Sequence, residues 1–301
     1  MDTTTATNTI QMAKGPLINN TNTEQMEGGP PINYTKTEAV IIGLILAIIA
    51  IMTIFGNILV IGATIISQGL KTKTRYFIVS LATADILVAV LVMPFGIYQQ
   101  VNNLFWDFGD SVCKLSTCFD IMFSSASIYN LLCIAIDRYM AICMPFHYHN
   151  LTKKIILGLL IGCWTMPIPY SFLAIFMEWN LIGIEEIYSM MTSQGNTCIF
   201  LENIPYALIA STISFFLPMI ALIGIYTKIF YIAIKQSNQI AALNAQVNPK
   251  EQKNMKHEKR AAKSLAIIVG VFLICWLPFF TFNILDPLIG YKIPFVPWMV
   301  V

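Results

Sequence analysis

One long apolar stretch, residues 113–139, carries the residues whose types and spacing can do chemistry. It holds a single acid, Asp120, near its start and the triplet Asp137, Arg138 and Tyr139 at its end. As a helix rising ~1.5 Å per residue, it would place Asp120 and Arg138 roughly 27 Å apart, close to the ~30 Å of a bilayer core. A charge within a membrane costs at least ~2.5 kcal/mol, so each one needs a partner or a function.

Ser124 and Ser127 follow Asp120 at helical spacing, which predicts one polar face directed into a bundle. A carboxylate on such a face suits a protonated amine, because a charge-assisted hydrogen bond loses little to screening in a poorly solvated cleft. The alternative is a buried acid paired with a side chain of another helix. The base that stands in the outer half of a complete span is Lys114, which we expect at the rim.

The composition indicates a membrane protein. The chain has 301 residues, of which 56% are hydrophobic and 11% charged, against about 25% charged in soluble domains. We expect an all-α bundle over residues 38–301, with spans at about 38–67, 75–99, 112–142, 154–177, 203–235 and 258–287. A seventh span begins at 293–301, too short to cross a bilayer, so the sequence looks truncated.

Charge placement predicts the orientation. Basic residues follow spans one, three and five, whereas the alternate loops are acidic, which places the first set in the cytosol and the N-terminus outside. Residues 1–37 read as a disordered extracellular tail with two glycosylation acceptors, Asn19 and Asn33. Cys113 and Cys198 are the cysteines expected at the outer face, so we pair them as a disulfide and expect the other five to be reduced.

Motifs in successive spans resemble those of the rhodopsin-like (class A) G-protein-coupled receptors, which implies a seven-transmembrane bundle. Each motif is weak alone, but their order is specific. They are Gly56-Asn57, Leu81-Ala82-Thr83-Ala84-Asp85, Asp137-Arg138-Tyr139, Trp164, Phe215 with Pro218 and Tyr226, and Cys275-Trp276-Leu277-Pro278.

Within that family, Asp120 seven residues after Cys113 resembles the amine-binding branch. The surrounding residues are most similar to those of trace amine-associated receptors, although many of these have a cysteine in the tail and this chain has none before Cys113. The rest of the seventh helix, with the family's Asn-Pro-x-x-Tyr, is also missing. The resemblance implies a ligand site of Asp120, Ile121, Ser124, Ser211, Ser214, Trp276, Phe279, Phe280 and Asn283.

The alternatives for these residues are structural. The aromatic side chains would form a floor and wall around the cation, or else pack against lipid and core. Ser211 and Ser214 would hydrogen-bond a ring substituent, or else ease helix packing. Ala210 stands where related receptors place a polar or acidic group, which argues against a catecholamine or a deep second acid. A diamine could use an acid at the rim, unless these are solvated loop acids: Glu178, Glu202 or Asp286.

The resemblance also implies a switch at the cytosolic end, formed by Asp137, Arg138, Tyr139, Tyr226 and Glu258. Arg138 would contact Glu258 in the resting state, unless Glu258 is a solvated charge. Asp85, with Ser127 and Asn57, resembles a sodium site, because hard oxygen donors suit a small cation. The alternative is a polar network between helices.

We therefore expect a plasma-membrane receptor for small protonated amines of the trace amine or biogenic amine type. It would signal to a heterotrimeric G protein of the stimulatory or olfactory type. We expect no enzymatic activity, no nucleic-acid partner and no cofactor beyond sodium. The alternatives are a receptor for serotonin or another monoamine, a truncated non-signalling remnant, and a transporter, although no inverted repeat supports the last.

Overall fold

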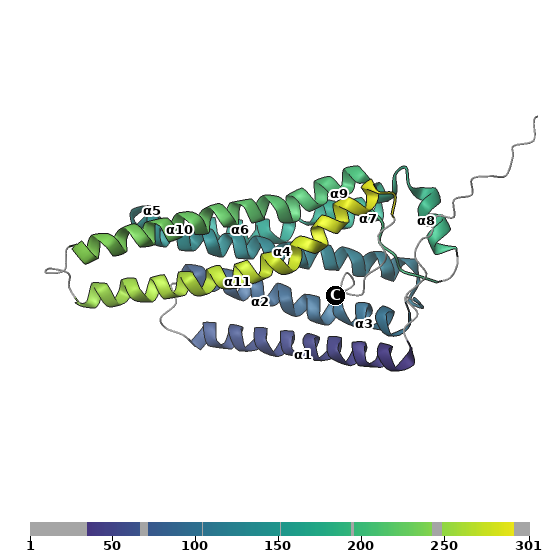
Figure 1. The fold of residues 1–301 in the computed structure, drawn as a ribbon, viewed down its shortest axis with the longest axis horizontal. Coiled ribbons are helices and arrows are strands. Elements are labelled where there is room, and N and C mark those ends of the chain that lie inside the picture. The colour runs from purple at the N-terminus through teal and green to yellow at the C-terminus, as the bar shows by residue number, and fades with distance from the viewer. Residues whose placement is uncertain are drawn as a thin grey trace, which may run out of the picture.

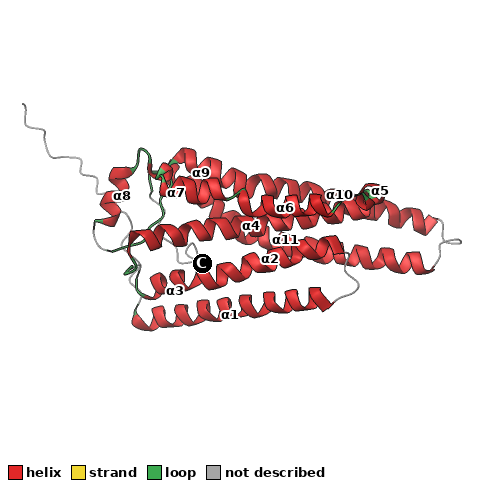
Figure 2. Ribbon diagram, turned by 180° about the vertical axis from the view of Figure 1, so that it is seen from behind, coloured by secondary structure: helices red, strands yellow, loops and turns green. Residues whose placement is uncertain are grey.

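The computed structural model describes residues 35–66, 72–103, 105–150, 152–193, 196–242 and 249–291. This part of the chain is helical throughout apart from its connections and one isolated bridge between Phe105 and Thr197 (Figures 1 and 2). The expected tail, with Asn19 and Asn33, and the expected start of a seventh span at 293–301 lie outside the described residues.

Six helical segments in the described residues are long and apolar enough to cross a membrane. This confirms the prediction of an all-α membrane bundle. The segments are Lys36–Ile66, Lys73–Val101, Gly109–Cys143, Lys153–Phe176, Ile204–Ile232 and Gly270–Leu288.

Helix α4 (Gly109–Cys143) is the central helix of the bundle. More than half of its most apolar window is buried, 56%, against 11–33% in the other five spans. It packs against α2 (Thr72–Leu91), α6 (Lys153–Thr165) and α10 (Leu217–Ala242), while α1 (Lys36–Ile66) lies outside against α2 (Figures 1 and 2). The helix that carries Asp120 is therefore surrounded by other helices rather than by lipid.

The second span, expected at 75–99, is Lys73–Val101, and it contains one break. Helix α2 ends at Leu91 and α3 (Met93–Val101) begins after Val92, with Pro94 in its first turn. Proline lacks an N–H and is tolerated in a first turn but not in a helix interior, so the chain restarts a helix there.

Two further spans contain π-helical turns. One, Pro169–Leu173, separates α6 from α7 (Ala174–Phe176), and the other, Thr212–Phe216, separates α9 (Ile204–Ser211) from α10. The hydroxyl of Tyr129 on α4 donates to a carbonyl of the second π turn, that of Ile213, at 3.2 Å.

The last long helix, α11 (Pro249–Leu288), begins nine residues before the expected start at 258. Its outer end packs beside α9, and it crosses the bundle obliquely (Figure 1). Pro278 and Pro287 both lie inside it.

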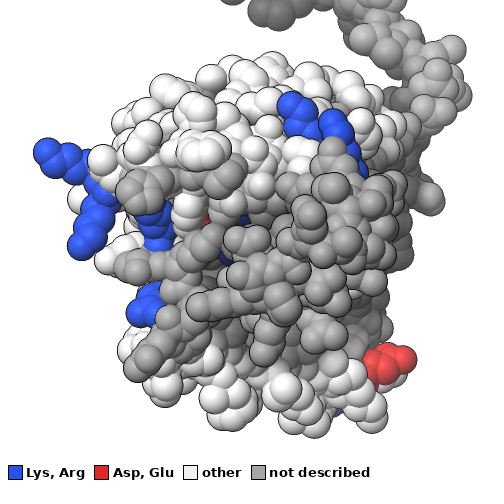
Figure 3. Space-filling model, turned by 90° about the vertical axis from the view of Figure 1, so that its left-hand side faces the viewer, with Lys and Arg blue, Asp and Glu red and all other residues white. Residues whose placement is uncertain are grey.

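The two ends of the bundle differ in charge. Figure 3 shows the end where α1 and α4 finish, on which Lys and Arg side chains gather among the described residues. This is the asymmetry on which the predicted orientation depends. The basic residues near that end are Lys73, Arg75, Lys153, Lys154, Lys228 and Lys235.

Candidate ligand-binding site

Asp120 lies on α4, seven residues or about 10 Å along the helix from Cys113. Its side chain is exposed, whereas the neighbouring Phe123 and the run 125–128 are buried. The Ser124 hydroxyl donates to its carboxylate at 3.3 Å, and no described basic residue forms an ion pair with it. The structure therefore offers no support for the alternative of an interhelical ion pair within the described residues.

Ile121, next to Asp120, joins a buried apolar cluster between α4 and α9. The cluster includes Phe200 from the loop that enters α9, and its buried members are Tyr170, Ala174, Tyr206 and Ala210. Because Phe200 and Ile121 share this cluster, the loop before α9 lies beside the part of α4 that carries Asp120.

Ser211 and Ser214 lie at the junction of α9 and the second π turn, and both are almost fully buried. Neither hydroxyl has a hydrogen-bond partner among the described residues. Both hydroxyl groups can donate to or accept from a polar ligand group. Whether they bind a ligand stays a prediction.

The predicted aromatic residues form one cluster at the level of Ile128, two helical turns along α4 from Asp120. Trp276 contacts both phenylalanines, with ring centroids 5.6 Å from Phe279 and 5.7 Å from Phe280. Phe280 stacks on Phe215 of the second π turn, with the two ring centroids 4.4 Å apart. The cluster thus lies between Asp120 and the C-terminal end of α4, while Asn283 lies half-buried nearly one turn beyond Phe280.

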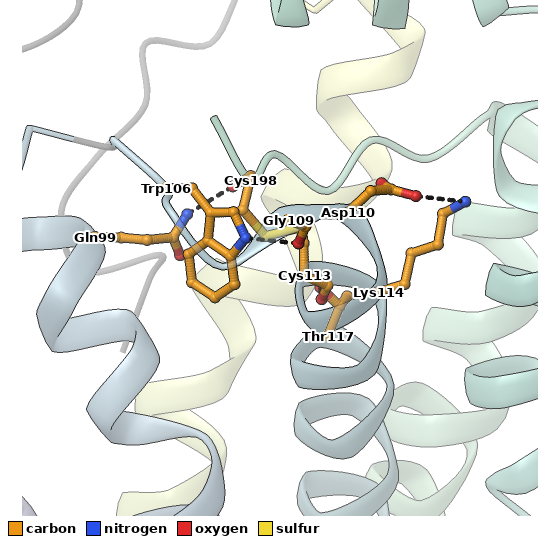
Figure 4. The surroundings of a disulfide bond; sticks show 8 residues. All are labelled: Gln99, Trp106, Gly109, Asp110, Cys113, Lys114, Thr117 and Cys198. Carbon is orange, nitrogen blue, oxygen red and sulfur yellow. Dashed lines mark hydrogen bonds and ion pairs between the residues drawn. A yellow bond between two sulfur atoms is a disulfide. The ribbon is translucent and has the colours of Figure 1, made fainter. Parts of the chain in front are cut away.

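The predicted disulfide is confirmed, because Cys113 and Cys198 are bonded. Figure 4 shows how the neighbourhood fixes it: the Gln99 amide donates to the Cys198 carbonyl at 2.7 Å, and the Trp106 indole donates to the Gly109 carbonyl at 2.9 Å. The other five cysteines are free, as expected. The loop after Cys198 is therefore tied to the outer end of α4.

Lys114 lies at the rim, as expected. Its ammonium group pairs with Glu178 at 2.8 Å and with Asp110 at 3.1 Å, the second pair visible in Figure 4. Glu178 is exposed and neutralised by this contact.

Glu202 corrects the expectation that the acids of the outer loops are solvated. It is only 9% exposed, and burial raises the pKa of its carboxyl group to about 8. The cause is local: Asn203, the next residue, donates its backbone N–H to the Asn180 carbonyl at 2.8 Å, and the Asn180 amide donates to the Leu201 carbonyl at 2.9 Å. These bonds hold the loop against the bundle.

At the C-terminal end of α4, Arg138 binds Asp137 at 2.7 Å and also contacts Thr74 of α2. The Thr74 hydroxyl in turn donates to Asp137 at 2.5 Å. The side chain of Glu258, the other predicted partner of Arg138, lies outside the described residues. Tyr139 is half-buried in the same turn.

Three other predicted residues, Tyr226, Ser127 and Asp85, lie inside the bundle. The Tyr226 hydroxyl is buried without a hydrogen-bond partner. Ser127 donates to Asp85 at 2.9 Å, but the Asn57 amide bonds to the Thr53 carbonyl of its own helix. Asp85 and Ser127 supply two oxygen donors that fit sodium, and no described cluster of three or more acid, histidine or cysteine residues surrounds them. Sodium binding stays a prediction.

Sequence reasoning missed Thr74, Tyr129 and Tyr291. Thr74 carries no charge and Tyr129 lies in a span rich in apolar residues, so neither has a local signal. Tyr291 follows Gly290, and both adopt positive φ, 58° and 77°. The Gly-Tyr pair after a helix end could have indicated such a turn.

The chain belongs to the rhodopsin family of seven-transmembrane receptors, whose family model matches residues 56–297. It is 39% identical to 5-hydroxytryptamine receptor 4 of Cavia porcellus over 270 residues, which cover 84% of this chain and 69% of that receptor. It is 37% identical to trace amine-associated receptor 4 of Mus musculus over 249 residues, 81% of this chain and 71% of that receptor. The octopamine receptor beta-2R of Chilo suppressalis is 37% identical over 266 residues, 80% of this chain and 66% of the receptor.

The family confirms the predicted resemblance to class A receptors and identifies the chain as a multi-pass membrane receptor rather than an enzyme. Receptors of this family bind a ligand and couple to G proteins, so both partners follow from membership.

Proposed function

We propose that this chain is a receptor for small protonated amines and that Asp120 binds the ammonium group. The observation that carries the proposal is that this carboxylate has no basic partner among the described residues. It is exposed on the central helix, and its hydrogen-bond donor is the Ser124 hydroxyl. An ammonium ion supplies the missing charge and up to three donors.

The similar receptors support this class of ligand. By their names they respond to 5-hydroxytryptamine, trace amines and octopamine, all of which carry one basic amine. The feature shared by these ligands is the cation, and Asp120 is the group that suits it.

The proposal includes an orientation. The N-terminus lies outside the plasma membrane, and the basic end in Figure 3 faces the cytosol, where positive residues concentrate. Amine binding beside Asp120 would favour a state in which the Asp137–Arg138 end of α4 separates from α11 and admits a stimulatory or olfactory type of G protein.

A second candidate is a receptor for a hydroxylated aromatic monoamine such as serotonin. The hydroxyl groups of Ser211 and Ser214 favour it, because each can hydrogen-bond a ring hydroxyl or an indole N–H. A trace amine without a ring substituent offers these two hydroxyl groups no such partner.

The decisive variant is Asp120→Asn, which keeps the size of the side chain and removes its charge. Losing a charge-assisted hydrogen bond costs about 1.5–3 kcal/mol, so amine potency should fall roughly 10- to 150-fold or more. Cyclic AMP is measured in cells that express equal surface amounts of the full-length chain. Asp110→Asn, at the rim, is the matched control.

Amine potency that survives Asp120→Asn would overturn the proposal. Parallel uptake measurements separate it from a transporter, which would accumulate the amine without a cyclic AMP response. Replacing Ser211 and Ser214 by alanine separates the two candidate functions. If the potency of serotonin falls and that of an unsubstituted phenylethylamine does not, the receptor for a hydroxylated aromatic monoamine is favoured.

A further inference from the structure

Asn203 caps α9 and also binds a second segment of the chain. Its side-chain oxygen accepts from the backbone N–H of Tyr206 at 2.9 Å, which is the usual bond of a helix N-cap. Its side-chain amide donates to the backbone carbonyls of Trp179 at 2.8 Å and Ile182 at 3.1 Å. A cap needs only the oxygen, so the amide has a second role: it holds the chain that follows α7 against the start of α9.

Asn180 strengthens the same junction from the other side. Its carbonyl accepts from the backbone N–H of Asn203 at 2.8 Å, and its amide donates to the Leu201 carbonyl at 2.9 Å. Asn180 is 4% exposed and Asn203 is 8% exposed, so water does not compete for these bonds. The segments 179–182 and 201–203 are therefore held together as one unit.

The segment 179–182 is anchored to α4 at its other end. Glu178 directly precedes it, and the Lys114 ammonium group donates to the Glu178 carboxylate at 2.8 Å. Lys114 also pairs with Asp110, but this acid lies on the same helix, as Figure 4 shows. Glu178 is thus the ion-pair partner through which Lys114 joins α4 to another element.

Glu178 adopts a left-handed backbone conformation, with φ of 55° and ψ of 27°. Residues with a Cβ atom are uncommon in this region, which glycine or asparagine usually occupies after a helix end. Strain of this kind persists where the surrounding contacts require it. Glycine could not form the pair with Lys114, so this contact accounts for a glutamate at the position.

A continuous chain of polar contacts thus runs from α4 to α9. We call it the outer strut, and it consists of Lys114, Glu178, the segment 179–182 and Asn203. Both helices carry proposed ligand partners a short way along from the strut. Asp120 follows Lys114 by about 9 Å of helix, and Ser211 follows Asn203 by about 12 Å.

Other links between these elements do not replace the strut. The Tyr206 hydroxyl donates to the Tyr170 carbonyl at 2.5 Å, which ties α9 to the chain after α6 rather than to α4. The disulfide ends at Cys198, five residues before Asn203, and five residues can extend to about 17 Å. The apolar cluster that includes Ile121 lies between α4 and α9, but apolar contacts are not directional.

We propose that the outer strut fixes the spacing of α4 and α9 and thereby selects ligands that reach both Asp120 and the serines of α9. Lys114 and Asn203 are positioning residues in this role. The inference rests on the proposed amine binding at Asp120 and on the ring contacts of the second candidate function. A ring-hydroxylated monoamine needs both contacts at one separation, whereas an unsubstituted amine needs only Asp120. Loosening the strut therefore weakens the first ligand more than the second.

The test measures the potency of serotonin relative to that of unsubstituted phenylethylamine. Cyclic AMP is recorded in cells that express equal surface amounts of the full-length receptor or its variants. Both ligands carry one ammonium group, so a change of charge at the rim acts on both and cancels in the ratio. The ratio of the two potencies therefore reports the spacing of the helices rather than the electrostatic field.

Asn203→Ser is the decisive variant. Serine is also a preferred N-cap, so the change keeps the cap of α9 and removes the amide that binds the carbonyls of Trp179 and Ile182. We expect the potency ratio to fall at least threefold, with phenylethylamine potency within about twofold of the parent value. The matched control is Glu186→Gln, a change at an exposed acid of the same loop that forms no ion pair with a described residue. It should leave the ratio unchanged.

Lys114→Met cuts the other end of the strut and covers the case in which Asn203→Ser does not reach the surface. We expect the same fall in the ratio, whereas Lys114→Arg keeps the ion pair with Glu178 and should retain the parent ratio. Because both changes interrupt one strut, the double variant should lower the ratio no further than the more severe single variant.

Three results would overturn the inference and leave amine activation in place. They are an equal loss of potency for both ligands, effects that multiply in the double variant, and a parent chain that phenylethylamine activates but serotonin does not. Activation of the parent chain by no amine at all would instead overturn the proposed function and the inference with it.

Discussion

The Thr74 hydroxyl on α2 donates a 2.5 Å hydrogen bond to the Asp137 carboxylate on α4. Arg138 binds the same carboxylate and also contacts Thr74, so the three side chains form one closed group across two helices. Asp137 is almost fully buried, and it keeps Arg138 beside its own helix. An uncharged residue of α2 thus restrains Arg138, the arginine of the predicted switch.

Thr74→Val should raise signalling in the absence of ligand. The change keeps the shape of the side chain and removes both hydrogen bonds, which costs about 1 kcal/mol and shifts the resting equilibrium roughly fivefold. Basal cyclic AMP at matched surface expression measures it. Thr74→Ser keeps the hydroxyl and is the control; equal basal activity of the two variants would contradict the role of this bond.

Tyr129→Phe should destabilise the receptor, whereas Tyr226→Phe should not. The Tyr129 hydroxyl donates to the Ile213 carbonyl in the π turn and is also hydrogen-bonded to the Tyr170 hydroxyl, so its loss costs about 1–3 kcal/mol. The Tyr226 hydroxyl is buried without a partner, and removing it is neutral or stabilising. Thermal unfolding of the two variants in the same detergent measures the difference, and an equal loss in both would count against this account of the π turn.

Replacing Cys113 and Cys198 together by serine should reduce surface expression strongly. The bond closes a loop with a sequence separation of 85 residues, for which chain entropy gives about 4–5 kcal/mol. It also holds the loop that carries Phe200 and Glu202. Cys275→Ser removes an exposed free cysteine and is the control. Normal expression of the double variant, measured by surface labelling, would show that the loop is held without the bond.

The contribution of Glu202 to stability should fall as the pH rises. Its pKa is about 8 in the folded chain and 4.5 ordinarily, so between these values the folded state holds a proton that the unfolded state has lost. The contribution is therefore complete below about pH 4.5 and is lost as the pH passes through about 8.

Thermal unfolding of the parent chain and Glu202→Gln at constant ionic strength isolates this effect from other titrations. The titratable groups on which the charge of Glu202 acts are Tyr206 from α9 and Tyr291 from the turn beyond α11. The unfolding temperature of the parent chain minus that of Glu202→Gln should fall by a few degrees between about pH 5 and pH 8. A difference that is constant or grows would mean that the carboxyl group is not protonated when buried.

The sequence was sufficient for the bundle because its signals are strong and local. Long runs without charge, such as 39–70, predict spans by length alone, and the two cysteines at the outer face predicted the disulfide. Pro94 marks the break between α2 and α3, but a long apolar run concealed it.

The sequence was insufficient where contacts join distant segments. The surroundings of Glu202 combine residues from the loop before α9 and the turn beyond α11, 89 positions apart. No local pattern distinguishes it from the exposed Glu178, since both are loop acids in the printed sequence. Likewise, nothing beside Thr74 indicates that it bonds to Asp137, 63 positions away.

The hydrogen bond from the Tyr291 hydroxyl to the Glu202 carbonyl fixes the chain just beyond the C-terminal end of α11, so the rest of the helix can pivot about that end. That end is tied to the entrance of α9, while Pro278 interrupts the helix ten residues before its last residue. From Pro278 to Pro249 the helix extends about 43 Å, so a bend of roughly 10° at the proline would displace the far tip by about 7 Å. A small rearrangement beside the outer acids would therefore be amplified several-fold at the opposite membrane face.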